Sequence, residues 1–302
     1  MEQFKSGFVS IIGRPNVGKS TLLNRLIGEK ISIMTSKPQT TRTKITGILN
    51  GENSQIVFID TPGIHKPKHK LGNVMNQTVN ESIKDVDLLI FIVEAEDTQI
   101  GKGDMYILQK VIESKIPCIL VINKIDKIKR DNLLPIIKQY MDLHNFKAVV
   151  PISALNNDGV NILHEEILKN IPYGPKYYED DEITNQSEKE IVAEIIREKA
   201  LKLLDEEIPH GIIVQIDTFK LKEKSDGTKY YNIEATIFCE KDSHKGIIIG
   251  KEGTMLKRIS TYARQDIEKF MDKKVNLKTW VKVKDKWRDN EKIVKNFFKT
   301  DN

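Results

Sequence analysis

One eight-residue string near the start of the chain constrains its fold more than any other feature. The string follows a short apolar run at residues 8–12 and precedes an amphipathic stretch. It reads Gly13-Arg14-Pro15-Asn16-Val17-Gly18-Lys19-Ser20, with Thr21 directly after it. Its glycines let backbone N–H groups turn toward phosphate oxygens, and the helix that follows offers its positive N-terminus. The string predicts a phosphate-binding loop between a strand and a helix.

The first part of the chain has the pattern of a mostly parallel α/β sheet with helices on both faces, because short apolar runs alternate with amphipathic stretches. The predicted strands cover residues 8–12, 45–50, 55–59, 88–93, 118–122 and 148–152. Helices are predicted to begin at Gly18 and near Asn73, Gly103, Asn132 and Asp158. Open sheets of this class bind ligands at the carboxyl ends of their strands.

The pattern changes at residues 171–186, where two prolines, a glycine and an acidic cluster predict a linker. Beyond it we expect an α+β domain. Its predicted elements are helix 188–205, a hairpin of strands 212–221 and 230–240, helices 243–249 and 253–270, strand 275–283 and a basic helix 289–299. The expected organisation is a domain at residues 1–172, a linker at 173–186 and a second domain at 187–302.

The end of the chain is basic. Residues 241–302 contain 17 Lys and Arg against 9 Asp and Glu, whereas the rest of the chain contains 31 against 34. A basic domain beside a near-neutral one indicates a polyanionic partner. A solvated lysine-rich surface explains the charge equally well, so charge alone does not decide.

Composition and targeting signals predict a cytoplasmic protein. The chain is 39% hydrophobic and 30% charged, with two widely separated cysteines, as in a reducing compartment. The first residues lack the basic segment and apolar core of a signal peptide. No apolar run approaches the roughly 20 residues that a membrane span needs.

The phosphate loop supplies two groups with expected roles. Lys19 would contact the β- and γ-phosphates of a nucleotide, and the Ser20 hydroxyl would bind Mg²⁺. A glycine turn without a ligand is the alternative, and the position between strand and helix argues against it.

A second string, Asp60-Thr61-Pro62-Gly63, follows the strand at residues 55–59. Asp60 would hold the metal through a water, and Gly63 would offer its N–H to the γ-phosphate. Alone the string is an ordinary turn. In the polar stretch 37–42, one threonine should close over Mg²⁺, and we favour Thr41 over Thr40.

A third string, Asn123-Lys124-Ile125-Asp126, predicts selection of guanine. A carboxylate only accepts hydrogen bonds, so Asp126 can take both N–H donors of the guanine edge, which adenine lacks. Lys124 would lay its aliphatic stem along the base. The tripeptide Ser153-Ala154-Leu155 follows the next strand and fits a backbone donor to the guanine carbonyl.

A glycine pair near the far end, Gly250 and Gly253, is a weak signal alone because such pairs occur widely by chance, but its context favours contact with RNA. An apolar run leads into it and an amphipathic helix leaves it. The candidate RNA-binding residues are Ile248, Ile249, Gly250, Lys251, Glu252, Gly253, Lys257 and Arg258. For at least one of the two isoleucines, burial in a helix core is the favoured alternative, and the acidic Glu252 would moderate phosphate affinity.

Taken together, these strings resemble those of the bacterial Ras-like GTPases, in the branch of the Era family. The likeness extends over nearly the whole chain, including residues 194–199, 245–253 and 280–283. The element order of the second domain is similar to a type II KH domain, whose glycine loop clamps single-stranded RNA. The resemblance implies a GTPase that binds the 3′ end of small-subunit (16S) ribosomal RNA and assists 30S assembly and maturation, with RNA binding coupled to the GTP or GDP state.

The resemblance also bears on catalysis. Ile64 stands where many Ras-like GTPases have a glutamine that orients the attacking water, so slow intrinsic hydrolysis is expected. Related GTPases use an asparagine at the position of Asn16 to bind K⁺, which adds positive charge beside the phosphates. The expected catalytic contributors are therefore Asn16, Lys19, Thr41 and Gly63. His65 is a weaker candidate base, for which solvation is the favoured alternative.

Other interpretations remain open. One is an RNA-binding module with a GTP sensor and negligible hydrolysis, and another is a membrane-associated signalling switch. The resemblance implies peripheral contact with the inner membrane, with which a basic terminal helix carrying Trp287, Phe297 and Phe298 is consistent. A tandem GTPase of the Der type is excluded because no second phosphate-loop string occurs. We expect a monomer without a DNA partner. Residues 64–76 are expected to be too polar to pack in a core. They should become ordered when the γ-phosphate is bound.

Overall fold

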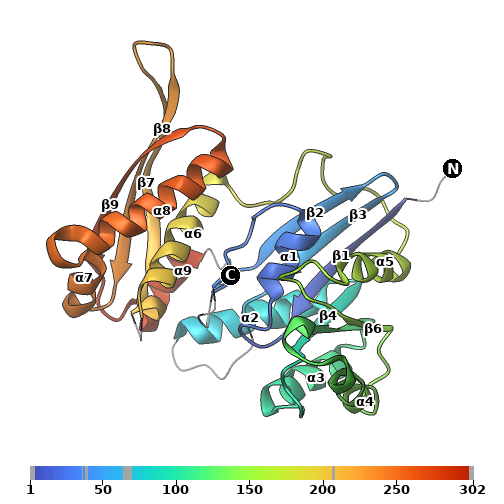
Figure 1. Cartoon of the computed structure of the whole chain (residues 1–302). Helices are drawn as coiled ribbons and strands as arrows, with labels where there is room; N and C mark the ends of the chain where they lie inside the picture. The colour runs from blue at the N-terminus through green and yellow to red at the C-terminus, as the bar shows by residue number, and fades with distance from the viewer. Residues whose placement is uncertain (1–3, 36, 38–39, 64–69, 206–207, 299–302) are drawn as a thin grey trace. The chain divides into compact units, whose positions relative to one another are not determined.

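The structure is a computed structural model that describes residues 4–35, 37, 40–63, 70–205 and 208–298. The chain forms two compact units (Figure 1). Unit 1 consists of Met1–Met34 and Gln39–Asn185, and unit 2 of Thr35–Pro38 and Gln186–Asn302.

Unit 1 is built on a six-stranded sheet in the order β2-β3-β1-β4-β5-β6. Its strands are β1 Lys5–Ile12, β2 Ile45–Gly51, β3 Ser54–Asp60, β4 Leu88–Glu94, β5 Cys118–Asn123 and β6 Ala148–Pro151. Only the pairing of β2 with β3 is antiparallel. The helices are α1 Lys19–Ile27, α2 Lys70–Lys84, α3 Lys102–Ser114, α4 Leu133–Met141 and α5 Val160–Asn170. This confirms the predicted α/β class.

Helices cover both faces of this sheet. Side chains alternate along β4, so that Ile90 enters the core with α1 and α5, and Phe91 enters the core with α2, α3 and α4. Because β4 is buried on both sides, its sequence reads as a continuous apolar run. The two cores hold the carboxyl ends of β1, β3, β4 and β5 at one edge, where the nucleotide strings lie.

The beginning of α2 corrects one expectation. Residues 64–69 lie outside the described residues, but Lys70 to Asn76 form the first turns of α2 and are not too polar for a core. Leu71, Met75 and Val79 are buried at four-residue intervals, which place them on one face of the helix.

The segment after α5 is attached to unit 1. The Gln55 side chain accepts hydrogen bonds from the N–H groups of Tyr177 and Tyr178, at 2.7 and 3.0 Å. The N–H of Ile48, in the edge strand β2, donates to the carbonyl of Ile183 at 2.9 Å. The predicted linker is thus hydrogen-bonded to residues of β3 and of the edge strand β2.

Unit 2 has the order α6 Glu188–Leu203, β7 Ile213–Glu223, β8 Lys229–Cys239, α7 Asp242–Ile249, α8 Thr254–Met271, β9 Lys274–Val283 and α9 Glu291–Phe298. The sheet order is β7-β8-β9, with β7 antiparallel and β9 parallel to β8. Ser187 and Glu190 form a capping box that starts α6. The α+β prediction for this unit is confirmed.

Helices α6 and α8 cover one face of this sheet. Their side chains Ile195 and Ile259 are buried with Ile233 and Ile237 of β8. The residues of β9 alternate accordingly, with Val275 and Val281 buried and Lys278 exposed on the other face.

Trp287 lies inside unit 2 and not at its surface. Its side chain is fully buried, and its indole N–H donates to the carbonyl of Gly211 at 2.8 Å. Trp287 therefore gives no support to a membrane-facing terminal helix, and the Phe298 side chain lies outside the described residues. Among the described residues, no helix is long and apolar enough to cross a membrane.

Candidate nucleotide site and RNA-binding loop

The phosphate loop, residues 13–20, connects the buried strand β1 to α1. Gly18 has a φ of 105° and leads directly into the helix, and Asn16 also has a positive φ, 67°. A Cβ at Gly18 would lie 2.2 Å from Nδ2 of Asn123, and one at Gly13 would lie 2.5 Å from the carbonyl of Ile92. The loop is therefore tightly fitted between two strands, and glycine is required at both positions.

Lys19 lies at the first position of α1 with its ammonium group turned back into the loop. Nζ donates to the carbonyls of Gly13 and Arg14, at 3.1 and 2.8 Å. Burial lowers the pKa of this ammonium from 10.5 to about 8, although the charge of Asp60 acts in the opposite direction. The group is held inside the loop, where phosphate would replace the carbonyl acceptors.

Three oxygen-bearing side chains from separate elements meet beside the loop. The Ser20 hydroxyl lies 2.8 Å from the Thr41 hydroxyl and donates to Asp60 Oδ2 at 2.7 Å. Burial raises the pKa of the Asp60 carboxyl above its ordinary value, although Lys19 and the hydroxyls act against this. Asp60 Oδ1 is buried without a hydrogen-bond partner among the described residues. Oxygen ligands of this kind suit Mg²⁺, and an unpaired carboxylate oxygen leaves one acceptor for a metal-bound water.

The Asp60–Gly63 string lies against the phosphate loop. The Thr61 hydroxyl is buried and donates to the carbonyl of Ile11 at 2.9 Å. A Cβ on Gly63 would lie 2.6 Å from the backbone nitrogen of Pro15, so the two strings touch at that point. Gly63 therefore lies beside Pro15 of the phosphate loop, while Ile64 and His65 lie outside the described residues.

The residues predicted to select guanine lie at the ends of β5 and β6. Asn123 joins the loops, since its Nδ2 donates to the carbonyl of Val17 at 2.8 Å and its Oδ1 accepts from the N–H of Ala154 at 2.9 Å. The Ser153 hydroxyl donates to Asp126 Oδ1 at 2.5 Å, which orients that exposed carboxylate. Lys124 has a positive φ, 67°, and pairs with Glu94. The Ala154 N–H already donates to Asn123. It therefore holds the two loops together in this structure.

The glycine loop, residues 250–253, joins α7 to α8. Gly250 has φ 74° and ψ 172°, a conformation essentially restricted to glycine, and Gly253 and Glu252 also have positive φ. Lys251 lies within the loop and Lys257 and Arg258 follow it on α8, and all three side chains are exposed. The loop therefore presents backbone and cations together.

The isoleucines that lead into this loop differ from one another. Ile248 is fully buried in the core of unit 2, so it is not available to an RNA base, and Ile249 is partly buried. Ile247, which is not among the predicted RNA-binding residues, is 52% exposed. Helical periodicity could have indicated that Ile247 is the exposed isoleucine, because adjacent residues of a helix point in different directions and Ile248 faces the core.

Comparison with known proteins identifies both parts of the chain. The family model described as 50S ribosome-binding GTPase matches residues 8–124, and a KH domain model matches residues 207–288. GTPase Era of Clostridium kluyveri is 56% identical over 291 residues, which cover 96% of this chain and 98% of that protein. GTPase Era of Clostridium tetani is 55% identical over 293 residues, with coverages of 97% and 98%. The chain belongs to the Era family of GTPases.

Solved Era structures share the whole architecture. One is Era in complex with MgGDPNP and nucleotides 1506–1542 of 16S ribosomal RNA, with a TM-score of 0.92 and 40% identity over 97% of this chain and 98% of that one. Another is a variant of Aquifex aeolicus Era bound to GDP.AlF4⁻, with a TM-score of 0.92 and 38% identity over 97% and 99%. An enzyme of the Era family hydrolyses GTP, and the predicted family, fold and activity class are confirmed.

Arg14 of this Era-family chain has a role that its sequence context did not reveal. Its side chain forms ion pairs with Asp97 and with Asp104, the latter at 2.8 Å from Nε. Asp104 is fully buried at the start of α3, and burial raises its pKa despite the guanidinium beside it. The Arg14 backbone remains part of the phosphate loop, and its side chain joins the loop to Asp97 and to α3 through Asp104.

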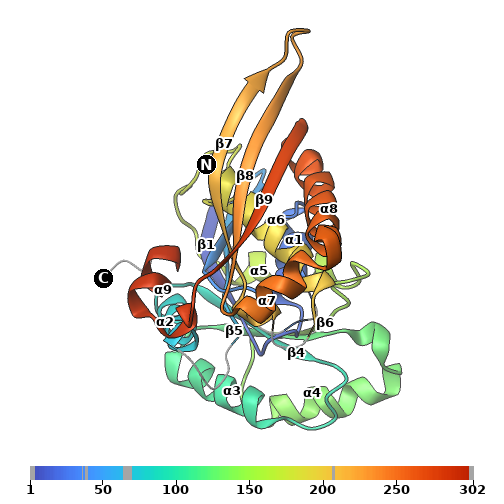
Figure 2. The same ribbon diagram turned by 90° about the vertical axis from the view of Figure 1, so that its left-hand side faces the viewer.

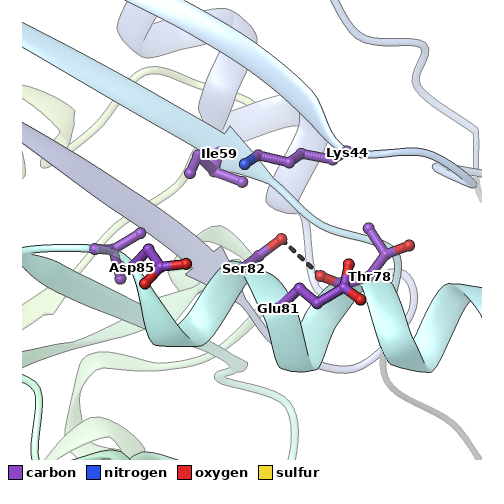
Figure 3. Close-up of a pocket in the computed structure, with 7 residues that line it drawn as sticks. Lys44, Ile59, Thr78, Glu81, Ser82 and Asp85 are labelled. Carbon is purple, nitrogen blue, oxygen red and sulfur yellow. Dashed lines mark hydrogen bonds between the residues drawn. The ribbon is translucent and has the colours of Figure 1, made fainter. Parts of the chain in front are cut away.

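A small cavity of about 140 Å³ lies in unit 1 and shares no residue with the nucleotide strings (Figure 3). Lys44 extends toward it from the segment before β2, and α2 contributes Glu81, Ser82 and Asp85 beside it. The Ser82 hydroxyl donates a hydrogen bond to the carbonyl of Thr78 at 2.7 Å. The nucleotide site is therefore defined by the loops at the strand ends and not by this cavity.

Nucleotide binding to this Era-family chain should weaken in mildly alkaline solution. The buried Lys19 has a pKa of about 8 without nucleotide, and phosphates should restore its charged form. Above pH 8 each binding event must then take up a proton, so affinity for GDP should fall by up to about tenfold per pH unit. Titration calorimetry between about pH 7 and 9.5, in buffers of different ionisation enthalpy, measures both quantities. Constant affinity without proton uptake would show that Lys19 stays charged in the free protein.

Proposed function

We propose that this chain is a GTP-hydrolysing switch that binds the 3′ end of 16S ribosomal RNA and assists assembly and maturation of the 30S subunit. The observation that carries the proposal is the presence, on one chain, of a full set of guanine-nucleotide loops and a glycine loop with exposed cations. Its likeness over 97% of the chain to an Era bound to MgGDPNP and nucleotides 1506–1542 of 16S ribosomal RNA supports the choice of RNA. We place the switch at residues 1–172 and the RNA-binding domain at 187–302.

Mg²⁺ would be held by Ser20 and Thr41, with Asp60 contacting it through a water. The convergence of their oxygens within 2.7–3.4 Å supports this assignment, and it favours Thr41 as the threonine that closes over the metal. The ion would neutralise charge that develops on the phosphates. Lys19 and the Gly63 amide would stabilise the same oxygens from the other side.

Hydrolysis should be slow and should depend on the monovalent cation. We expect replacement of Na⁺ by K⁺ to raise the rate about tenfold or more, because a K⁺ near Asn16 would place positive charge beside the transferring phosphoryl group. The variant Asn16→Gly tolerates the positive φ of 67° but removes the side chain, and should lose this dependence. Phosphate release in matched KCl and NaCl measures it. Equal rates in the two salts would remove the proposed role of Asn16.

Nucleotide state should set RNA affinity. The test is binding of 16S nucleotides 1506–1542 at fixed salt, first with a non-hydrolysable GTP analogue and then with GDP. We expect tight binding with the analogue that weakens markedly with GDP, because each nucleotide stabilises a different state of the switch. Equal, weak binding in both states would leave the GTPase and remove its ribosomal role. Single-turnover hydrolysis on 30S subunits distinguishes the switch from a GTP sensor with negligible hydrolysis.

We also infer a monomer in the cytoplasm with peripheral contact to the inner membrane. Charge is the remaining support for the membrane contact, because Trp287 is buried. Flotation with anionic vesicles, with and without competing RNA, tests it. Sedimentation of the purified chain tests the oligomeric state.

A further inference from the structure

The sheet of unit 2 has a second face, opposite α6 and α8. Figure 2 looks onto β7, β8 and β9, with α6 behind them and α8 beside β9. At one end of this face α9 packs on the sheet, where the rings of Phe297 and Phe238 are 5.9 Å apart. Among the residues on the rest of the face are four lysines and two aromatic residues, which we call the outer face: Lys220, Lys222, Tyr230, Lys274, Lys278 and Trp280.

The strand register places these side chains on the same side of the sheet. Lys222, Tyr230 and Lys274 form one row across the three strands, and Lys220 lies in the next row on the same face. Lys278 and Trp280 continue the alternation along β9 and are exposed. The outer face is therefore a continuous surface of β7, β8 and β9.

The lysines of the outer face are not neutralised. Lys220, Lys222, Lys274 and Lys278 form no ion pair with any described residue, whereas Lys199 of α6 pairs with Asp266 of α8. Two carboxylates on this side of the sheet, Glu234 and Asp217, accept hydrogen bonds from threonine hydroxyls and form no ion pair with these lysines. Glu234 accepts from the Thr218 hydroxyl at 3.0 Å, and Asp217 accepts from the Thr236 hydroxyl at 2.6 Å. The four lysines outnumber these two carboxylates, so this side of the sheet keeps a net positive charge, which attracts a polyanion.

Two aromatic rings stand among these charges. Trp280 is 44% exposed, although tryptophan carries a large apolar surface that ordinarily packs away from water. Tyr230 lies between Lys222 and Lys274 in its row, and the Lys224 ammonium is 5.9 Å from the centre of its ring. Aromatic faces interleaved with lysines provide stacking for bases and contacts for phosphates.

We propose that the outer face is a second RNA-binding surface, which takes the phosphate backbone on its lysines and stacks an unpaired base on Trp280. The surface is distinct from the glycine loop, because α8, which leaves that loop, packs on the opposite side of the sheet. Lys274 and Lys278 are four residues apart on one strand, or about 13 Å, so they contact different phosphates of the RNA. The proposal rests on the proposed RNA-binding function and extends the RNA site to both sides of the domain.

A charge-matched pair of variants tests the lysines in the full-length protein. One carries alanine at the outer face, at Lys220, Lys222, Lys274 and Lys278. The control removes the same charge from exposed, unpaired positions elsewhere, at Lys84, Lys138, Lys189 and Lys269. With 16S nucleotides 1506–1542, the outer-face variant should bind at least about tenfold more weakly than the control. Its salt dependence should fall by about 0.7 in log–log slope for each phosphate that no lysine reaches any longer. Equal affinity and slope for the two variants would overturn the proposal.

Trp280 provides a direct optical test. The chain has two tryptophans, and the other, Trp287, is buried and contributes a constant background. Stacking of a base on Trp280 should quench the emission when RNA saturates the protein, and Trp280→Ala should remove the change and weaken binding. Trp280→Phe should keep most of the affinity, since a ring remains. Saturation without quenching, or equal affinity of the alanine variant and the wild type, would overturn the stacking contact.

The outcomes separate this inference from the proposed function. If the wild type does not bind RNA, both fail together. If Gly250→Asp abolishes binding while the outer-face variant equals its control, the inference alone fails. If the outer-face variant loses binding to phosphatidylglycerol vesicles but keeps its RNA affinity, the surface belongs to a membrane and the inference is again overturned.

Discussion

Asp126→Asn should reduce affinity for GTP by about 10²–10⁴-fold and create affinity for xanthosine triphosphate. The carboxylate would accept two hydrogen bonds from the guanine edge, and each hydrogen bond to a charged group contributes about 1.5–3 kcal/mol. An amide presents a donor to the guanine amino group, which is itself a donor. Xanthine has a carbonyl oxygen at that position and can accept from the new amide. The Ser153 hydroxyl, 2.5 Å from Asp126 Oδ1, can still orient the asparagine through its carbonyl oxygen.

Competition between the two nucleotides for the purified variant measures this change of specificity. Asp131→Asn is a matched control, because it makes the same replacement at an exposed position in the segment before α4. It should keep the GTP preference of the wild type. If Asp126→Asn kept GTP affinity within a few-fold, base selection would have to come from other groups, and the assignment of Asp126 would be wrong.

Gly250→Asp should abolish RNA binding and leave GTP hydrolysis without RNA unchanged. A Cβ at Gly250 would lie 2.8 Å from Cβ of Met255 and 2.9 Å from its backbone nitrogen, at a φ of 74° that side chains rarely adopt. The loop must therefore rearrange, and the new carboxylate repels phosphate. Both effects act where the backbone has to approach the RNA closely. A loss of about 100-fold or more is expected when contact geometry and charge both fail.

Gly246→Asp is the matched control for this variant. The position is exposed on α7, and an added Cβ there meets no atom within 4 Å. The control adds the same charge about one turn from the loop, so it should lose much less affinity than Gly250→Asp. Gel-shift titration with 16S nucleotides 1506–1542 compares the two, and circular dichroism checks the fold. Equal losses would assign the whole effect to charge and remove the geometric argument.

Residues whose chemistry is local were predictable from sequence. The phosphate loop, Asp60 and Asp126 each follow a buried strand, and the ends of parallel strands meet at one edge of a sheet. The structure accordingly brings Ser20, Thr41 and Asp60 within hydrogen-bonding distance of one another. Their binding roles remain predictions.

Other features depend on partners far away in the chain. The acids that hold the Arg14 side chain are 83 and 90 residues distant, so no local pattern points to them. The basic stretch after Trp287 favours a surface position for this residue, but its indole lies against Gly211. The start of α2 has more polar residues than apolar ones, which hides the helical interval that Leu71 and Met75 keep.

The segment that follows α5 closes an otherwise open side of the nucleotide-binding unit. Thr184 donates its hydroxyl to the carbonyl of Thr46 at 2.6 Å, and Ile183 accepts from Ile48, so part of the outer backbone of β2 is occupied. An unprotected edge strand is a template for strand addition by another chain. A fragment that ends at residue 172 would expose this edge and tend to aggregate, whereas a fragment that ends at residue 185 would carry its own cover. The connection between the domains thus also covers the edge strand β2 and prevents another chain from pairing with it.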